Sequence, residues 1–366
     1  IFLKINPGTD GALALGMAKL IIDNGWADRE YIEKYTYGFD QYKELADQYP
    51  LDRVSKITGL DPGLIYEAAK LYATNGPACT NYSASALVHH INGFNSHRAI
   101  LCLSALTGNF DRAGGNVPNP PTYLHKPAGF KVREHAFRSD RYPKDGERIG
   151  ARRFPLWNAQ FDEFQAMDLL RQLEEGTPYP VKAIFAMGMN AKMFPETDKL
   201  LAAMKDKLDF FVDTDMFMTM TAKYADIVLP ACSSVERGEL KAYQGGYLTF
   251  TKPVIPPLYE SKSDVDILCG LARVMDLDDP YLKAGYEASA DWMIDGCGLT
   301  VADLKASDLP VKVPAAKWPV KPGNCLENGF KTATGKFEFY STAIASIDPA
   351  FGLNPLPDYR DSLEDQ

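Results

Sequence analysis

Apolar positions at helical spacing predict three helices in the first third of the chain. The first follows Asp10, has apolar residues at positions 13, 17, 20 and 21, and stops at Gly25. The second begins at Asp61-Pro62, an acidic cap followed by a proline in the first turn. The third is an apolar run over residues 96–106. With short strands predicted over residues 1–6 and 78–82, this region is expected to be a layered α/β unit.

A strand–helix pattern repeats between residues 180 and 230. The near-continuous apolar run over 181–187 is typical of a strand covered on both faces, and further strands are predicted over 208–212 and 226–229. Helices are expected between them, one through Leu200, Leu201 and Met204 and one near residues 218–224. This order favours a parallel sheet.

The remaining segments are less regular, and three domains are predicted. Residues 1–118 form an α/β half-domain, and residues 119–260 form an α/β domain that begins with a long irregular excursion rich in Arg, Lys and Pro. Residues 261–366 combine a helix over 265–274, a connection and a hairpin over 330–340 that pack on the core. The last twelve residues are polar and acidic and are expected to add no core.

Composition and charge exclude several classes of protein. Hydrophobic residues make up 46% and charged residues 24% of the 366 residues, as in globular proteins. The net charge of −9 argues against a nucleic-acid binder, which needs clustered Lys and Arg. No apolar run approaches the roughly 18 residues of a membrane span, so no direct span is expected. The six cysteines show no metal-binding spacing and are expected to be scattered free thiols.

Three turns at predicted strand ends suit an anionic cofactor. Ligands of open α/β sheets bind outside the carboxyl ends of the strands, and the helix N-termini located there offer free N–H groups. The turns are formed by Pro7, Gly8, Thr9 and Asp10, by Gly188, Met189 and Asn190, and by residues from Asp215 to Thr219. Asp10 and Asp215 either cap the helices that follow them or offer a carboxylate to the N–H groups of a guanine edge. Neither a complete G-x-G-x-x-G motif nor a P-loop is present, which disfavours an ordinary NAD or ATP site.

The loop after the second predicted strand contains His89 and His90. Loops at this position in α/β folds often hold functional residues. The alternative is that both are solvated histidines without a role.

Longer sequence motifs include two of these turns and lie elsewhere in the chain as well. They are PGTDGAL at 7–13, LTGNFD at 106–111 with GGN at 114–116, and DMFMTMTAKYADIVLP at 215–230. Shorter strings fit the same pattern at 236–238, 245–246 and 334–338. Together they resemble molybdopterin oxidoreductases, the large catalytic subunits of the dimethyl-sulfoxide-reductase superfamily. The resemblance covers nearly the whole chain, and the string at 215–230 is its most specific part.

The resemblance implies two Rossmann-like dinucleotide-binding layers with mostly parallel sheets and irregular insertions. It also implies molybdenum or tungsten held by two molybdopterin guanine dinucleotides (bis-MGD). The turn around Asp10 would hold one nucleotide, and Gly188, Asn190, Asp215 and Thr219 would hold the other. The loop over 82–92 would approach the metal, so Tyr82, His89 and His90 are candidate substrate-side residues.

Other expected parts of such an enzyme do not occur in this sequence. By the resemblance, the cysteines for a [4Fe-4S] cluster and the metal ligand would precede Ile1, and a further cofactor-binding domain would follow Gln366. We therefore expect a central fragment that is inactive alone, from a bacterial cytoplasmic or periplasmic enzyme. Its partners would be a small-molecule substrate and an iron–sulfur electron-transfer subunit.

The resemblance also bears on the reaction, which would be two-electron or oxygen-atom transfer. Formate dehydrogenases of the family carry an Arg-Gly-Gln-Asn stretch where VPNPPTY stands here at 117–123. The sequence is therefore nearer to the sulfur-compound reductases and to acetylene hydratase. The alternatives are a non-redox hydratase, or a non-catalytic subunit such as the large iron–sulfur subunit of respiratory complex I.

Overall fold

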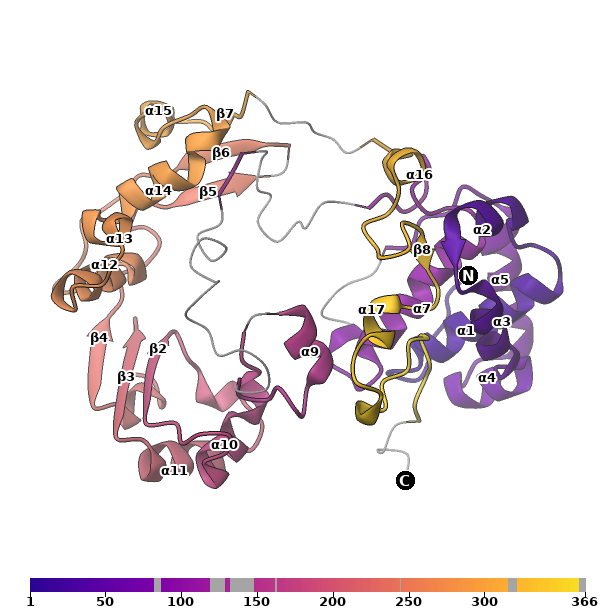
Figure 1. The fold of residues 1–366 in the computed structure, drawn as a ribbon, viewed down its shortest axis with the longest axis horizontal. Helices are drawn as coiled ribbons and strands as arrows, with labels where there is room; N and C mark the ends of the chain where they lie inside the picture. The colour runs from indigo at the N-terminus through magenta and orange to yellow at the C-terminus, as the bar shows by residue number, and fades with distance from the viewer. Residues whose placement is uncertain are drawn as a thin grey trace. The chain divides into compact units, whose positions relative to one another are not determined.

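The computed structural model describes residues 1–81, 87–118, 129–131, 148–161, 163–243, 245–314 and 321–361. The chain divides into two units (Figure 1). Unit 1 comprises residues 1–120 and 320–366, and unit 2 comprises residues 121–319. Unit 2 is therefore inserted between the two segments of unit 1.

Unit 1 is mainly helical. Its helices are α1 (Asp10–Asp23), α2 (Arg29–Tyr35), α3 (Phe39–Asp47), α4 (Leu51–Thr58), α5 (Pro62–Thr74), α7 (Gly93–Leu106), α16 (Asn324–Asn328), α17 (Thr342–Ala345) and the 3-10 helix η6 (Pro349–Phe351). Helix α1 is central, because α3, α4, α5 and α7 all pack against it. The predicted helices after Asp10 and Asp61 are confirmed, and Asp61 caps α5 by accepting the Gly63 N–H at 2.8 Å. The third predicted helix is also confirmed, and α7 begins three residues earlier.

The strand predicted over residues 1–6 is wrong. The alternation itself is real, since Leu3 and Ile5 pack against the core while Phe2 and Lys4 are exposed. However, the segment pairs with no described strand, and it is held instead by the Asn6 N–H, which donates to Thr58 O at 2.9 Å. A strand needs a hydrogen-bonded neighbour, which alternation alone does not provide.

The strand predicted over 78–82 is also wrong for residues 78–81, and Tyr82 lies outside the described residues. The side chain of Asn116 accepts the Thr80 N–H at 2.9 Å and donates to Thr80 O at 2.8 Å. Asn109 accepts the Ala78 N–H at 3.2 Å. These amide side chains take the place of a neighbouring strand.

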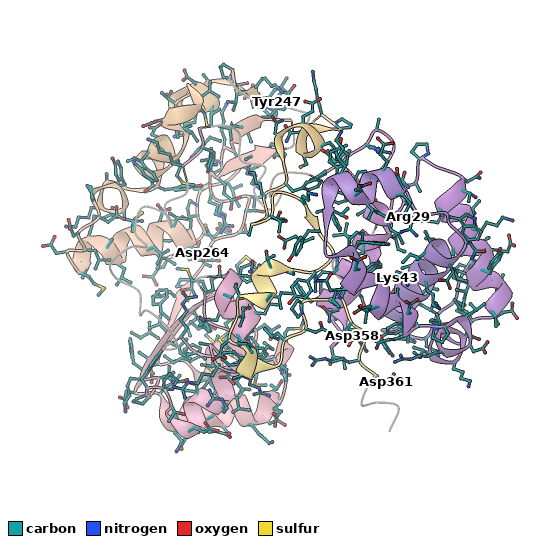
Figure 2. All side chains as sticks on the ribbon, turned by 45° about the vertical axis from the view of Figure 1, so that its right-hand side comes forward. Arg29, Lys43, Tyr247, Asp264, Asp358 and Asp361 are labelled. Atoms are coloured by element: carbon teal, nitrogen blue, oxygen red, sulfur yellow. The ribbon has the colours of Figure 1, made fainter. Side chains whose placement is uncertain are left out.

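The C-terminal segment completes unit 1. Strand β8 (Phe337–Glu338) pairs in parallel with β1 (Thr36–Tyr37), so the hairpin predicted over 330–340 is wrong. Tyr359 is buried in the core, and Asp358, which is labelled in Figure 2, accepts a hydrogen bond from Tyr49 Oη at 2.7 Å. The expectation that the last twelve residues add no core is therefore wrong, because Tyr359 is buried there and Leu356 packs against the same core.

Unit 2 contains the predicted parallel sheet. Strands β2 (Ala183–Met187), β3 (Phe210–Asp215) and β4 (Ile227–Pro230) lie side by side in that order (Figure 1). Apolar residues of α10 (Leu169–Glu175) and α11 (Thr197–Lys207) pack with Ala186 and Phe211 of the sheet. Strand β2 is not covered on both faces as predicted, because Phe185 points away from this core and is exposed.

The connection between β3 and β4 is shorter than predicted. Instead of a helix near residues 218–224, it forms a single 3-10 turn, η4 (Ala222–Tyr224). The side chains of Asp215 and Thr219 bond to the N–H groups of Phe217 and Ala222, so the first part of the connection folds as turns. The three strands are nevertheless parallel, as predicted.

A second, antiparallel sheet lies in the later part of unit 2. It consists of β5 (Leu240–Tyr243), β6 (Tyr247–Phe250) and β7 (Val311–Lys312). The other elements of the unit are α9 (Pro155–Gln160), α12 (Asp264–Val274), α13 (Pro280–Ala284), α14 (Tyr286–Ile294), α15 (Val301–Ala306) and the 3-10 turns η2 (Ala166–Asp168), η3 (Ala191–Met193) and η5 (Asp295–Cys297). Helix α12 confirms the helix predicted over 265–274. Leu248 and Ile294 are at the centre of a core shared by β6, α14 and α15.

The predicted α/β fold with parallel sheets is confirmed, while the three domains over 1–118, 119–260 and 261–366 stay a prediction. All six cysteines are free thiols. Within the described ranges, no helix has both the length and the apolar character needed to cross a bilayer.

Candidate functional site

The candidate site of unit 2 lies at the carboxyl edge of its parallel sheet. Gly188 directly follows β2 and donates its N–H to Thr214 O of β3 at 2.8 Å. Asp215 ends β3, and its carbonyl accepts the Ala231 N–H just beyond β4 at 3.1 Å. These bonds place Gly188 and Asp215 next to each other at the strand ends.

Thr221 joins two of the predicted turns. Its Oγ1 accepts the Ala191 N–H at 3.0 Å in a buried position. Ala191 follows Asn190, and Thr221 lies two residues after Thr219, so this bond holds the turn after β2 against the turn after β3. Sequence analysis missed Thr221, because the bond is tertiary and no motif marks it.

The polar side chains of this edge also shape their own turns. Asn190 Oδ1 accepts the Lys192 N–H at 3.2 Å, Asp215 Oδ1 accepts the Phe217 N–H at 3.0 Å, and Thr219 Oγ1 accepts the Ala222 N–H at 3.1 Å. Asp215 therefore closes the turn after β3. A carboxylate has about four lone-pair sites, so Asp215 can also accept N–H groups from a ligand.

A second acid on β3 is buried, and no described side chain pairs with it. Asp213 and Thr214 are buried, and no hydrogen bond from any described residue reaches either carboxylate oxygen of Asp213 or Oγ1 of Thr214. Burial, reinforced by the charge of Asp215, raises the pKa of Asp213 above its usual value. Strand alternation places Asp213 on the same face as Phe211, toward the core.

The edge fits a planar, hydrogen-bonding ligand such as a guanine nucleotide. Gly188 has a φ of +63°, and a β-carbon added there would meet no atom within 4 Å, so a ligand can approach the backbone closely. Asn190, Asp215 and Thr219 supply amide, carboxylate and hydroxyl groups around this opening. Met216, Phe217 and Met218 are exposed beside it and offer apolar surface for a ring.

The candidate site of unit 1 is the start of α1. Asp10 is the first helical residue and Thr9 is the N-cap, so Asp10 does not cap the helix. Thr9 Oγ1 donates to Asn6 O at 2.7 Å and makes no side-chain cap. Among the described residues, no side chain caps the N–H groups of Asp10, Gly11 and Ala12, and an uncapped helix start suits a phosphate.

His90 lies over this turn. Gly8 has a φ of +77°, and a β-carbon added there would lie less than 3.0 Å from Nε2, Cε1 and Cδ2 of the His90 ring. The structure thus brings His90 and Gly8 together within unit 1. His89 is exposed, and Tyr82 lies outside the described residues.

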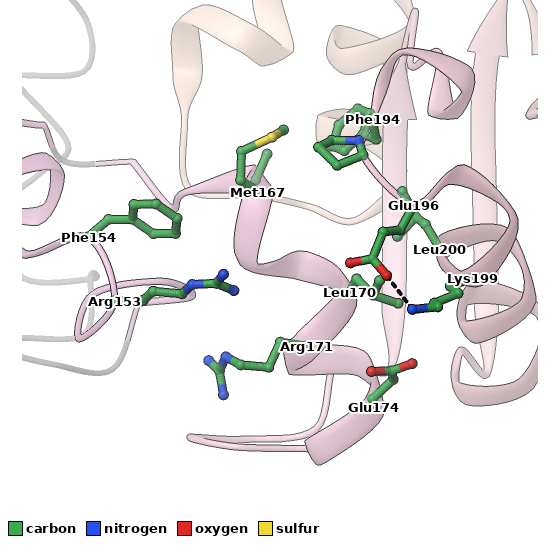
Figure 3. A pocket seen from close by; sticks show the side chains of 12 residues that line it. Arg153, Phe154, Met167, Leu170, Arg171, Glu174, Phe194, Glu196, Lys199 and Leu200 are labelled. Carbon is green, nitrogen blue, oxygen red and sulfur yellow. Dashed lines mark hydrogen bonds and ion pairs between the residues drawn. The ribbon is translucent and has the colours of Figure 1, made fainter. Parts of the chain in front are cut away.

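A pocket of about 440 Å³ also lies in unit 2, between α10 and the start of α11 (Figure 3). Arg153 and Arg171 line it, but both bind the buried carboxylate of Asp168, and Lys199 pairs with Glu196. The bond from Arg171 keeps the pKa of Asp168 below its usual value. The cations of the pocket are thus already neutralised, and none of the predicted site residues lines it.

No group of three or more His, Cys, Asp or Glu side chains in the described parts of the chain is arranged to hold a metal ion.

The chain is similar to several known proteins. Residues 2–274 match the family model described as molybdopterin oxidoreductase. Over its whole length, the chain is 30% identical to the probable oxidoreductase YoaE of Bacillus subtilis, covering 50% of that protein. It is 29% identical to the acetylene hydratase of Syntrophotalea acetylenica, covering 51% of that protein.

The structure is similar to that of acetylene hydratase from Pelobacter acetylenicus. The TM-score is 0.83 at 26% sequence identity, over 99% of this chain and 51% of the hydratase. The chain thus spans about half the length of the curated relatives it matches.

Proposed function

Because the chain belongs to the molybdopterin oxidoreductases of the dimethyl-sulfoxide-reductase superfamily, we propose that it holds the two dinucleotides of a molybdenum or tungsten bis(molybdopterin guanine dinucleotide) cofactor. The start of α1 would take one dinucleotide, and the sheet edge of unit 2 would take the other. When bound, the cofactor would supply two-electron or oxygen-atom transfer on a small substrate.

The observation that carries this proposal is the gathering of Gly188, Asn190, Asp215 and Thr219 at one sheet edge, joined through Thr221. Asp215 would accept the paired N–H groups of a guanine edge, and a charge-assisted bond of this kind is strong. The open space at Gly188 would admit the nucleotide to the backbone. In unit 1, the uncapped N–H groups of α1 would bind the pyrophosphate.

The reaction of the whole protein is a finer question. Relatives include a thiosulfate reductase subunit from Salmonella typhimurium and a formate dehydrogenase subunit from Methanocaldococcus jannaschii. We favour a sulfur-compound reductase over a formate dehydrogenase. Such a reductase would contain its own [4Fe-4S] cluster and would have an iron–sulfur electron-transfer partner. A non-catalytic subunit like that of complex I is less favoured, because both candidate turns suit nucleotides.

A non-redox hydratase is the second candidate. It is supported by the acetylene hydratase structure, which is similar over 99% of this chain. Assaying the cofactor-loaded protein that contains this chain for acetylene hydration and for acceptor reduction separates the two. This chain alone is expected to be inactive and to bind isolated cofactor weakly in calorimetry.

The proposed nucleotide site is tested by counting guanine nucleotides. The loaded protein should release two per chain on acid treatment, together with one molybdenum or tungsten. Asp215→Asn should lower the nucleotide content by about half, because a neutral amide binds the guanine edge less strongly. Asp209→Asn, an exposed acid at the start of β3, is the matched control and should release two. A wild-type protein without guanine nucleotide, or an Asp215→Asn variant that keeps both, would overturn the proposal.

A further inference from the structure

Methionines gather at the carboxyl edge of the parallel sheet in unit 2. Six of the eleven in the chain lie at the ends of β2 and β3 or in the turns that follow them: Met187, Met189, Met193, Met216, Met218 and Met220. Met193, after β2, is 80% exposed, and Met216, Met218 and Met220, after β3, are 56%, 62% and 42% exposed. These last four residues form what we call the methionine patch.

The backbone that carries the methionine patch is held by hydrogen bonds. Asp215 Oδ1 accepts the Phe217 N–H at 3.0 Å, and the Thr219 N–H donates to Phe217 O at 2.8 Å. The buried bond from the Ala191 N–H to Thr221 Oγ1 joins this turn to the turn that carries Met193. The exposure of the four thioethers is therefore a feature of the folded edge.

An exposed thioether is open to oxidation, because the oxidant has to reach the sulfur atom. Hydrogen peroxide transfers one oxygen atom to the sulfur. The O–O bond breaks, an S–O bond forms and the rest of the peroxide leaves as water, so the sulfur loses the two electrons that the peroxide gains. The sulfoxide is polar, whereas the thioether makes favourable contacts with aromatic rings. Oxidation would thus remove the apolar surface that this edge offers to a ring.

From these observations we infer that the methionine patch is an oxidation site controlled by occupancy of the nucleotide site in unit 2. When the site is empty, hydrogen peroxide oxidises the patch, and the polar sulfoxides then prevent the guanine ring from binding. When the nucleotide is in place, its ring covers the thioethers and keeps them reduced. The inference rests on the proposed function and makes loading of this site sensitive to an oxidant.

The first test compares the cofactor-loaded protein that contains this chain with cofactor-free protein made in cells that produce no molybdopterin. Both are treated with hydrogen peroxide, and peptide mass spectrometry follows the sulfoxide formed at each methionine. In the cofactor-free protein, the patch should react about as fast as Met275, which is 59% exposed just after α12. In the loaded protein, the patch should react about tenfold more slowly than Met275, because the ring hinders access to sulfur.

Two methionines outside the patch serve as internal controls. Met275 should react equally fast in the loaded and the cofactor-free protein. Met204 is buried in the core of unit 2 and should stay reduced in both, which shows that the unit is folded. If Met204 is oxidised in the cofactor-free protein, the comparison of the patch with Met275 in the loaded protein carries the test, with slower oxidation of the patch expected.

The second test measures the effect of oxidation on loading. Cofactor-free protein is oxidised, freed of peroxide and incubated without oxygen with cofactor released from the loaded protein, and bound guanine nucleotide is counted. The oxidised wild type should bind one nucleotide per chain, and the untreated wild type should bind two. A variant with leucine at all four patch positions keeps the apolar surface without the sulfur, and it should bind two after the same treatment. Met275→Leu is the matched control and should behave as the wild type.

The outcomes separate this inference from the proposed function. If the loaded wild type contains two guanine nucleotides but its patch reacts as fast as Met275, the inference is overturned and the proposed function stands. The inference is also overturned if the patch reacts equally slowly without cofactor, or if the oxidised wild type and the leucine variant bind equal amounts of nucleotide. A loaded wild type without guanine nucleotide overturns both.

Discussion

Two glycines of similar backbone conformation lie at the two candidate turns, and their surroundings differ. Gly8 in unit 1 has a φ of +77° and is covered by the ring of His90. Gly188 in unit 2 has a φ of +63° and faces open space. A left-handed glycine thus marks a tight turn in both places, but the space that a β-carbon would take is occupied by a side chain at Gly8 and empty at Gly188.

The largest expected effect comes from giving each glycine a side chain. Gly8→Ala should lower the free energy of unfolding of unit 1 by about 2–4 kcal/mol, since backbone strain of about 1–2 kcal/mol adds to overpacking against His90. Gly188→Ala should cost unit 2 only the strain, about 1–2 kcal/mol. Both losses of stability can be measured by urea unfolding, with hydrogen exchange of peptides from α1 and β3 reporting on unit 1 and unit 2. Equal losses of stability in the two variants would mean that the contact with His90 adds nothing to the cost of a side chain at position 8.

The next effect concerns how the edge of unit 2 is held together. Thr221→Val removes the acceptor of the buried Ala191 N–H, and it should lower the stability of unit 2 by about 1–3 kcal/mol. The same measurement on Thr74→Val provides the control, because that exposed hydroxyl donates only within its own helix. Stability changes of the same size in the two variants would contradict the role given to Thr221.

The smallest effect tests the unpaired acid beneath the edge. The pKa of Asp213 is raised in the folded protein, so folding favours its protonated form. Stability should therefore fall as pH rises above about 3.8, the usual pKa of an aspartate, and through the folded pKa. Asp213→Asn does not titrate, and it should become more stable than wild type by about 1 kcal/mol at neutral pH.

Denaturation at a series of pH values gives this difference directly. Below pH 3.8 the two proteins should have nearly equal stability. Asp209→Asn, which replaces an exposed acid, is the matched control. A constant difference between Asp213→Asn and wild type over the whole series would show that folding does not shift the pKa of Asp213.

The elements that could be predicted from sequence are those whose signal is local. Helix α1 and its stop, the cap of α5 and the parallel order of β2, β3 and β4 all follow from spacing, caps and turn residues. The placement of Asp215 at a strand end follows in the same way. Each of these features depends on residues that are close together along the chain.

The features that could not be predicted depend on partners far away in the sequence. The segment around Thr80 has its backbone groups satisfied by Asn116, so it needs no strand neighbour. The cover of Gly8 by His90 and the bond between Ala191 and Thr221 are tertiary contacts without a local pattern. The unpaired state of Asp213 likewise appears only once the surrounding side chains are placed.

The insertion of unit 2 within unit 1 has a consequence for synthesis on the ribosome. Strand β1 pairs with β8, and Tyr49 bonds to Asp358, across some three hundred residues of chain. The first hundred or so residues therefore emerge long before the segment that closes their core, while unit 2 is contiguous and can complete its fold first. During that interval Tyr42 lacks Phe339, its stacking partner, and the nascent chain is open to chaperones.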